Sequence, residues 1–280
     1  MQTLQAVIVG AIQGISEFLP ISSSAHIVFS SSIYKLICGV DLANNAGFEE
    51  IFFDIIVHLA TLLALFIFFW RDIVEILKSF FVGLKTKNYT DENFKIGVYI
   101  LAASPITAAI ALILKSPTEF LVENPKFVSL FLIITGFILF FSEKLKSKNK
   151  EMDLKMALWT GLAQGMAIIP GLSRSGLTIA TQVFLGSDRV KAAKFSFLMS
   201  IPIILMASMV YPMLEFDFSQ FTGFNHKAMF FGFLTSFVVG YLCIKYFMKL
   251  LSKVTLKCFA YYCIVAGVAM FVLFSICHRL

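Results

Sequence analysis

Six apolar stretches, each long enough or nearly long enough to cross a bilayer, follow one another along the chain. A transmembrane helix needs about 20 apolar residues, and the stretches run over residues 51–70, 96–115, 127–142, 193–213, 228–248 and 257–276. Only 14% of the residues are charged, compared with about 25% in soluble domains. The pattern therefore predicts an all-α polytopic membrane protein with about six transmembrane helices, forming a single integral membrane domain over residues 1–280.

Two further apolar regions, residues 4–34 and 156–186, are interrupted by clusters of glycine, proline and serine. Each has the pattern of a helix, a break and a second helix. Irregular backbone at membrane depth is tolerated only where protein surrounds it or where it lines a cavity. We therefore predict two re-entrant helical hairpins, each of which returns to the side from which it entered.

The two interrupted regions resemble each other in sequence. GAIQGISEFLPISSSAH (residues 10–26) aligns with GLAQGMAIIPGLSRSGL (residues 161–177) at a constant offset of 151. The identical positions are small or polar residues in apolar surroundings: Gly10 and Gly161, Gln13 and Gln164, Gly14 and Gly165, Ser22 and Ser173, and Ser24 and Ser175. A similar three-helix pattern follows each copy. We predict an internal duplication, with repeat one over about residues 1–142 and repeat two over about 152–280.

The basic residues indicate how the loops are distributed, because cytoplasmic loops are enriched in lysine and arginine. If both interrupted regions are hairpins, 17 of the 23 basic residues fall on one side and 5 on the other, with Arg174 inside a hairpin. If each region crossed the membrane once, the split would be 12 to 10. The net charge of +6 therefore reflects membrane topology, and we expect no nucleic-acid partner.

Three spans then separate the two hairpins, so the repeats have inverted topology. The first hairpin enters from the outside and the second from the cytoplasm, and both termini face outward. The stretch RDIVEILKSFFVGLK (residues 71–85) gathers its apolar residues on one helical face. This face predicts an interfacial helix on the cytoplasmic side.

An arginine lies in the middle of the second interrupted region. Arg174 has no acidic residue within ten positions on either side, and an arginine at membrane depth costs about 2.5–3.5 kcal/mol on insertion scales. Serines in each break can cap the helix that follows, and a helix N-terminus attracts anions. In an inverted repeat two such ends can meet near the midplane. These features predict an anionic ligand such as a phosphate, held by the arginine fork; a structural pair with Glu17 is the alternative.

The first break carries a second group of polar residues, in the sequence LPISSSAH that follows Glu17 and Phe18. If the second helix begins near Ser22, the hydroxyls of Ser22 and Ser23 share a face with His26. That arrangement suits a nucleophile and its base, and it also suits a buried polar network. An intramembrane carboxylate such as Glu17 favours a functional role.

Three further observations concern polar residues outside the serines of the breaks. Gln13 lies one turn before Glu17, so it can position the carboxylate or bind a ligand, but an amide cannot act as a base. Asp54 and His58 lie at i and i+4, and we expect them to satisfy each other within the bundle. The five cysteines are scattered, with neither metal-ligand spacing nor a disulfide framework.

These motifs resemble those of the undecaprenyl-diphosphate phosphatase family, also called the bacitracin-resistance family. The resemblance is carried by QGISEFLPISSSAH (residues 13–26) and PGLSRSGLT (residues 170–178), and it extends over essentially the whole chain. It implies a membrane phosphatase that hydrolyses undecaprenyl diphosphate to undecaprenyl phosphate and inorganic phosphate. Such an enzyme recycles the lipid carrier of cell-wall synthesis and confers resistance to bacitracin.

The resemblance also implies roles for individual residues. It maps the family's roles onto Glu17, Ser23, His26, Ser173, Arg174 and Thr178. Together with the positions of the other polar residues, we expect catalytic roles for Glu17, Ser23, His26 and Arg174. We expect substrate-binding roles for Gln13, Ser22, Ser173, Arg174, Ser175 and Thr178. A divalent cation, Mg²⁺ or Ca²⁺, is the expected cofactor, with Glu17 as its protein ligand. Because Gln13 occupies the first position of the family's (E/Q)xxxE element, a single motif carboxylate remains, and a cation clamped between two glutamates is not expected. Which of Ser23 and His26 attacks phosphorus stays open.

Inverted repeats with broken helices are also the architecture of secondary transporters. A transporter or lipid flippase with an anion site at the repeat interface is therefore the alternative function. A serine, a histidine and an arginine around one site favour hydrolysis, because a carrier needs no nucleophile. The expected location is the bacterial plasma (inner) membrane, with the active site opening to the outer side. The expected partners are the isoprenyl diphosphate substrate and membrane lipids, and the sequence leaves open whether the chain forms a homo-oligomer.

Overall fold

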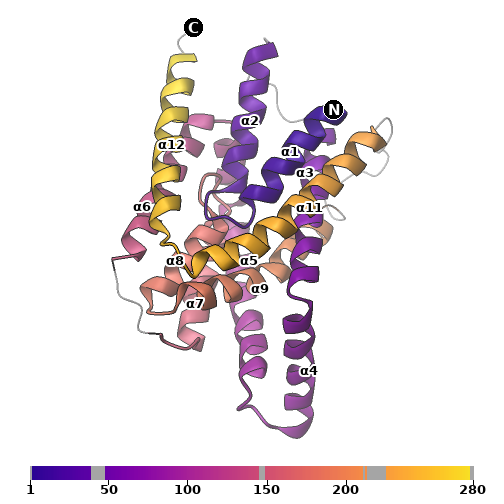
Figure 1. Cartoon of the computed structure of the whole chain (residues 1–280), viewed down its shortest axis with the longest axis vertical. Helices are drawn as coiled ribbons and strands as arrows, with labels where there is room; N and C mark the ends of the chain where they lie inside the picture. The colour runs from indigo at the N-terminus through magenta and orange to yellow at the C-terminus, as the bar shows by residue number, and fades with distance from the viewer. Residues whose placement is uncertain (1, 39–47, 145–148, 211, 213–224, 278–280) are drawn as a thin grey trace.

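Helices make up all the regular structure in the part of the chain that the computed structural model describes, namely residues 2–38, 48–144, 149–210, 212 and 225–277 (Figure 1). Six of them are long and apolar enough to cross a membrane. They are α3 (Phe48–Phe68), α5 (Glu92–Val122), α6 (Pro125–Ser142), α9 (Arg189–Leu205), α11 (His226–Leu251) and α12 (Lys257–Cys277). Each overlaps one predicted stretch, and α9 continues into a π-helical turn, η1 (Met206–Val210). The predicted class, an all-α polytopic membrane protein, is confirmed.

The two interrupted regions each form a pair of shorter helices. The first pair is α1 (Thr3–Ser16) and α2 (Ser23–Cys38), and the second is α7 (Leu154–Met166) and α8 (Arg174–Phe184). The offset of 151 residues that relates the two motifs also relates the first residue of α1 to that of α7, and the first residue of α2 to that of α8. The start of α1 and the end of α12 lie toward the same end of the molecule (Figure 1). The inverted repeat and the re-entrant path stay predictions, with which these features agree.

The packing of the shorter helices agrees with the relation between the two interrupted regions. α1 packs along α11, and α7 packs along α5, so each hairpin rests on a span of the other predicted repeat. Gly14 and Gly165, which the offset pairs, both lie at these crossings: a Cβ at Gly14 would stand 2.8 Å from the carbonyl oxygen of Ser236, and one at Gly165 would stand 2.7 Å from Cβ of Ile110. Close approach of the helices therefore requires glycine at both positions.

The pair formed by α6 and α12 is reciprocal. A Cβ at Gly136 would lie 2.8 Å from the carbonyl oxygen of Ala260, and a Cβ at Gly267 would lie 2.9 Å from that of Ser129. An offset of 131 residues relates Gly136 to Gly267 and Ser129 to Ala260. Each helix thus presents a glycine to a backbone carbonyl of the other, an arrangement that agrees with the predicted inverted repeat.

Aspartate side chains begin three of the helices. Asp91, Asp153 and Asp188 accept hydrogen bonds from backbone N–H groups in the first turns of α5, α7 and α9, at 3.0 Å, 2.7 Å and 2.8 Å. An anion at a helix N-terminus satisfies a free N–H and complements the helix dipole. The Lys150 ammonium and the capped N–H hold the pKa of Asp153 below its ordinary value.

The segment predicted as an interfacial helix forms α4 (Trp70–Thr86), but it does not turn across the bundle. Only Phe69 separates it from α3, so the chain has no room to reverse, and α4 runs on beyond α3 and pairs with the start of α5 (Figure 1). The rings of Phe80 and Phe94 stack there at 5.6 Å, while Leu77 and Phe81 are exposed. Part of the predicted apolar face thus packs against α5, and the rest is exposed on the surface of the molecule.

Candidate functional site

The break between α1 and α2 meets the break between α7 and α8 inside the molecule, as the sequence predicted. Glu17 follows the last residue of α1, and Arg174 begins α8; a guanidinium nitrogen of Arg174 lies 2.5 Å from Glu17 Oε1. The Ser175 hydroxyl donates to the carbonyl oxygen of Leu19 at 3.0 Å. Helices that begin 171 residues apart in the chain therefore place a carboxylate and a guanidinium at one point.

Glu17 is surrounded by groups that stabilise a negative charge. Its Oε2 accepts hydrogen bonds from the Ser23 hydroxyl at 2.8 Å and from the Gln13 amide at 3.0 Å. Nε2 of His58 lies 3.8 Å from the same oxygen. The side chain is almost fully buried, and a buried carboxylate persists only when it is paired and hydrogen-bonded in this way.

Arg174 has one guanidinium nitrogen without a hydrogen-bond partner. One terminal nitrogen, Nη2, binds Glu17, whereas the other, Nη1, is buried and has no partner. More than nine in ten buried polar groups in native proteins are hydrogen-bonded, so an orphaned guanidinium donor beside a cluster of hydroxyls is unusual. This donor is therefore available to an acceptor, as the prediction of an anionic ligand requires.

Ser23 and His26 lie on the first turn of α2, but they do not form the pair that the sequence suggested. The helix begins at Ser23, and Ser22 stands before it in a left-handed conformation with φ 68°. The Ser23 hydroxyl donates to Glu17. His26 instead makes contacts at both ring nitrogens, with the backbone carbonyl of Ser22 at 2.8 Å and with the Tyr262 hydroxyl at 2.7 Å. The candidate acceptor for the Ser23 proton is therefore Glu17.

The remaining motif residues shape the second break. Ser173 caps α8 by accepting from the N–H of Gly176 at 3.1 Å. The Thr178 hydroxyl donates to the Arg174 carbonyl at 2.8 Å and lies 2.5 Å from the Ser196 hydroxyl. Ser173, Ser175 and Thr178 are all buried, and their hydroxyls make contacts within the protein. These contacts fix the start of α8, and with it the position of Arg174; a role in substrate binding stays a prediction for these residues and for Ser22.

Two residues near the site carry no motif signal. His58 on α3 approaches Glu17, and its Nδ1 lies 2.8 Å from the Asp54 carbonyl and 3.5 Å from the Asp54 carboxylate. The prediction that Asp54 and His58 interact with each other is confirmed. Their spacing in the sequence, however, does not predict the contact of His58 with Glu17. Tyr262 on α12 binds His26 across 236 residues of sequence. Only the folded chain brings these groups together.

The oxygen atoms near Glu17 bear on the expected cation. Gln13 Oε1 is buried and has no hydrogen-bond partner, which makes it a free acceptor beside the carboxylate. Among the described residues, no three histidine, cysteine or acidic side chains form a group that could hold a metal ion. Magnesium is often bound by one or two carboxylates together with substrate phosphates. Both oxygens of Glu17 already have partners, so a cation at Glu17 and Gln13 would need further ligands, and it stays a prediction.

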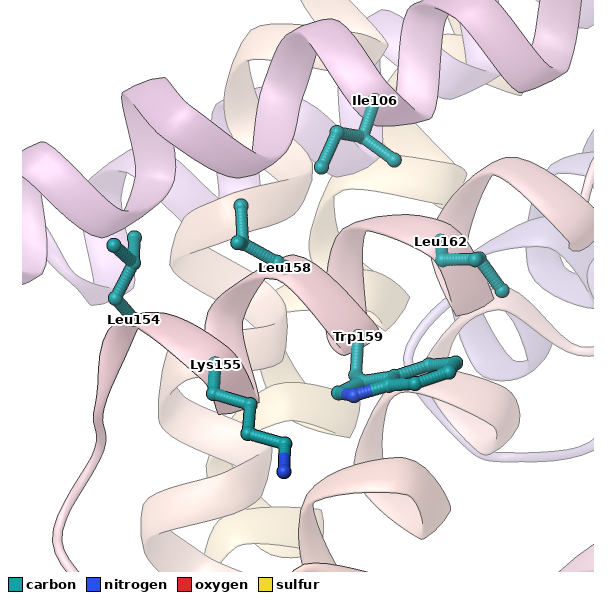
Figure 2. A pocket seen from close by; sticks show the side chains of 6 residues that line it. All are labelled: Ile106, Leu154, Lys155, Leu158, Trp159 and Leu162. Carbon is teal, nitrogen blue, oxygen red and sulfur yellow. The ribbon is translucent and has the colours of Figure 1, made fainter.

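A hollow of 530 Å³ lies elsewhere, between α5 and α7 (Figure 2). Ile106 of α5 lines it together with five residues of α7, of which Leu154 and Leu158 point toward α5; the others are Lys155, Trp159 and Leu162. None of the motif residues contributes to its lining, which is almost entirely apolar. The candidate chemistry therefore lies at the two breaks and not at this hollow.

Fold and site together define a polytopic membrane protein with a buried arginine–glutamate pair at the point where two interrupted helical pairs meet. Residues 6–269 match the family described as bacitracin resistance protein BacA. The chain belongs to this family, which confirms the resemblance carried by the two motifs.

Relatives are similar over almost their whole length. The chain is 37% identical to undecaprenyl-diphosphatase of Methanobrevibacter smithii over 284 residues, covering 97% of both chains. It is 36% identical to undecaprenyl-diphosphatase of Treponema denticola over 278 residues, covering 98% of both. With undecaprenyl-diphosphatase 1 of Shouchella clausii the identity is 34% over 281 residues, covering 97% of this chain and 96% of the relative.

Proposed function

We propose that this chain hydrolyses undecaprenyl diphosphate to undecaprenyl phosphate and inorganic phosphate within the membrane. The family and the names of its relatives support this activity, and they do not favour the transporter or flippase alternative. The observation that carries the proposal is the unpartnered Nη1 of Arg174, buried beside Glu17 and Ser23. A hydrolase of a membrane-bound diphosphate needs a positive donor and a nucleophile together at membrane depth.

Arg174 is the proposed diphosphate-binding residue. Phosphoryl transfer depends mainly on positioning and charge neutralisation, and a guanidinium offers phosphate two parallel donors. Glu17 occupies one end of this fork and leaves the other free. The positive end of the α8 dipole adds to the attraction, because Arg174 is the first residue of that helix.

Ser23 is the proposed nucleophile. Its hydroxyl already donates to Glu17 at 2.8 Å, which is the geometry of a nucleophile with its proton acceptor. In the proposed reaction Ser23 Oγ bonds to the terminal phosphorus, the bridging oxygen leaves with undecaprenyl phosphate, and the serine proton passes to Glu17. Water then cleaves the phosphoserine, which releases inorganic phosphate and restores the hydroxyl. His26 is the proposed acid and base for the leaving group and the water.

A divalent cation, Mg²⁺ or Ca²⁺, is the proposed cofactor. Glu17 and the amide oxygen of Gln13 would hold it together with the diphosphate, and its chemistry would be to neutralise phosphate charge. The proposed location is the plasma membrane, with the site opening to the outer side. The loops predicted to be cytoplasmic carry most of the basic residues, which supports this orientation. Whether the chain forms a homo-oligomer stays an open prediction.

The test is phosphate release by the purified protein from farnesyl diphosphate, an isoprenyl diphosphate with a shorter chain. Wild-type protein should release phosphate, and Ser23→Ala should lower kcat by at least ~10³-fold, as removal of a nucleophile does. Ser30→Ala is the matched control, because Ser30 lies on the same helix and its hydroxyl donates to the local carbonyl of Ile27 at 2.9 Å. A wild-type protein that binds the lipid and releases no phosphate would support the transporter instead.

A further inference from the structure

Tyr262 joins His26 across the contact between α2 and α12. His26 Nε2 and the Tyr262 hydroxyl are 2.7 Å apart, and the two rings stack, with centroids 5.7 Å apart and planes inclined by only 7°. The next residue, Cys263, lies with its thiol 3.5 Å from the carbonyl oxygen of Pro20. This part of α12 therefore borders the first break, close to the proposed reaction.

The other ring nitrogen of His26 determines the direction of both hydrogen bonds. Nδ1 lies 2.8 Å from the backbone carbonyl oxygen of Ser22, and a carbonyl oxygen can only accept. Nδ1 must therefore carry a proton. In a neutral imidazole the second nitrogen, Nε2, is then an acceptor, so the Tyr262 hydroxyl donates to it. Two fixed partners thus select one tautomer of His26.

We propose that Tyr262 is a positioning residue that keeps His26 in the tautomer with Nε2 as its basic nitrogen and fixes the plane of the ring. A hydroxyl can both donate and accept. It donates to Nε2 while the imidazole is neutral. When a proton from water arrives at the tyrosine oxygen, the tyrosine's own proton passes to Nε2, and the hydroxyl then accepts from Nε2–H. The contact therefore holds the ring in both states of an acid–base cycle.

The inference rests on the proposed function and adds two features to it. It assigns the nitrogen through which His26 exchanges protons, and it makes a residue from repeat two necessary for a group in repeat one. The stacked ring of Tyr262 also helps to fix the plane of the imidazole, because it limits rotation of His26 about its Cβ–Cγ bond. The side chains next to the proposed base thus come from both halves of the chain.

Nitrogen NMR of protein labelled with ¹⁵N-histidine tests the tautomer without any assay of activity. The chain has four histidines, and the His26 signals are those that disappear in His26→Gln. In the wild type, while the imidazole of His26 is uncharged, Nδ1 should carry a proton and Nε2 should not. Tyr262→Phe keeps the ring but removes the donor, so the two tautomers should mix. A proton on Nε2 in the neutral wild type, or an unchanged tautomer in Tyr262→Phe, would overturn the proposal.

The neighbouring tyrosine supplies a matched control. Tyr261 lies on the same helix, and its ring packs against Phe140 at 5.9 Å, away from His26. Tyr261→Phe removes a hydroxyl from α12 and should leave the His26 signals unchanged. Thermal unfolding of both variants should match the wild type, because each keeps its aromatic ring.

Kinetics of phosphate release test the consequence for the reaction. Tyr262→Phe should lower kcat about 10-fold, a part of the 10²–10⁴-fold that general acid–base catalysis contributes, with KM within about twofold of the wild type. Tyr262→Leu loses the stack too and should lose more. If Tyr262→Phe kept its full kcat, the contact of Tyr262 with His26 would only stabilise the fold, and the proposal would be wrong. A wild-type protein without phosphatase activity would refute the proposed function, and the NMR result would still decide the tautomer.

Discussion

At the scale of single residues, Arg174 meets two requirements at once. It pairs with Glu17, which is the structural role that the sequence offered as an alternative, and it retains a buried donor without a partner. A purely structural ion pair would satisfy the guanidinium on all sides, since unpaired buried donors are costly. The pair therefore holds the arginine in place, and the free donor is available for an anion.

Arg174→Lys separates these two roles. Lysine keeps the positive charge and can still pair with Glu17, but it lacks the two parallel donors of the fork. We expect thermal stability near that of the wild type and turnover lower by about 10²–10³-fold, by analogy with the loss of one oxyanion-hole donor. Phosphate release and thermal unfolding measure the two effects.

Arg174→Ala provides the contrast. It leaves Glu17 buried without its partner, so both stability and turnover should fall. Inorganic phosphate should protect the wild type against heat but not this variant. Rescue of stability by adding Glu17→Gln, together with a fully active lysine variant, would show that Arg174 serves the fold and does not bind the diphosphate.

Glu17→Gln tests the carboxylate. The amide keeps the size of the side chain but can neither take the Ser23 proton nor bind a cation as a carboxylate does, so turnover should fall by ~10³-fold or more. The protein should still insert, since an amide can bond Ser23 and Gln13. Gln13→Glu should remain active, because either residue fits the family's motif. Near-normal turnover of purified Glu17→Gln would remove the carboxylate from the mechanism.

At the scale of helices, the position of the site depends on how closely α1 packs on α11 and α7 packs on α5. Gly14 sets the crossing of α1 with α11, and Gly165 sets that of α7 with α5. Each glycine lies within one helical turn of the break that follows it. A shift at either crossing would therefore move Glu17 relative to Arg174.

Valine at Gly14 or at Gly165 should destabilise the protein to a similar extent. The new Cβ would stand 2.8 Å from the Ser236 carbonyl oxygen or 2.7 Å from Ile110 Cβ, closer than van der Waals contact allows, and overpacking of this kind typically costs about 1–3 kcal/mol. The melting temperature and phosphate release should both fall in each variant. Leu162→Val is the control, because Leu162 lies on α7 with 40% of its surface exposed. Unchanged melting temperatures for both glycine variants would contradict the close helix crossings.

At the scale of the whole molecule, the spans, the paired helices and the meeting of the two motifs could all be predicted from the sequence. Hydropathy identifies spans because a bilayer imposes their length, and the motifs marked the breaks at which Glu17 and Arg174 meet. The contacts of His26 with Tyr262 and of Glu17 with His58 could not be predicted, because they depend on which helix faces are adjacent. The course of α4 also escaped prediction, since its apolar face does not reveal that one residue separates it from α3.

The topology itself gives the last prediction. The hairpin interpretation assigns the loop between α4 and α5 to the cytoplasm and the start of α11 to the outside, and the structure sets these two segments at opposite ends of the molecule (Figure 1). Lys85 near the first and Lys227 near the second are both exposed. In a background without native cysteines, Lys227→Cys should react with an impermeant maleimide added to intact cells, whereas Lys85→Cys should react only after the membrane is opened.

Labelling of Lys85→Cys in intact cells at the rate of Lys227→Cys would contradict this orientation. The reversed pattern, with only Lys85→Cys labelled, would place the excess of basic loops outside and invert the molecule. The proposed site would then lie in the same fold but would open to the cytoplasm. Because the positive-inside rule sets orientation by counting charges in short loops, the 17 to 5 division makes the outward orientation of both termini the expected result.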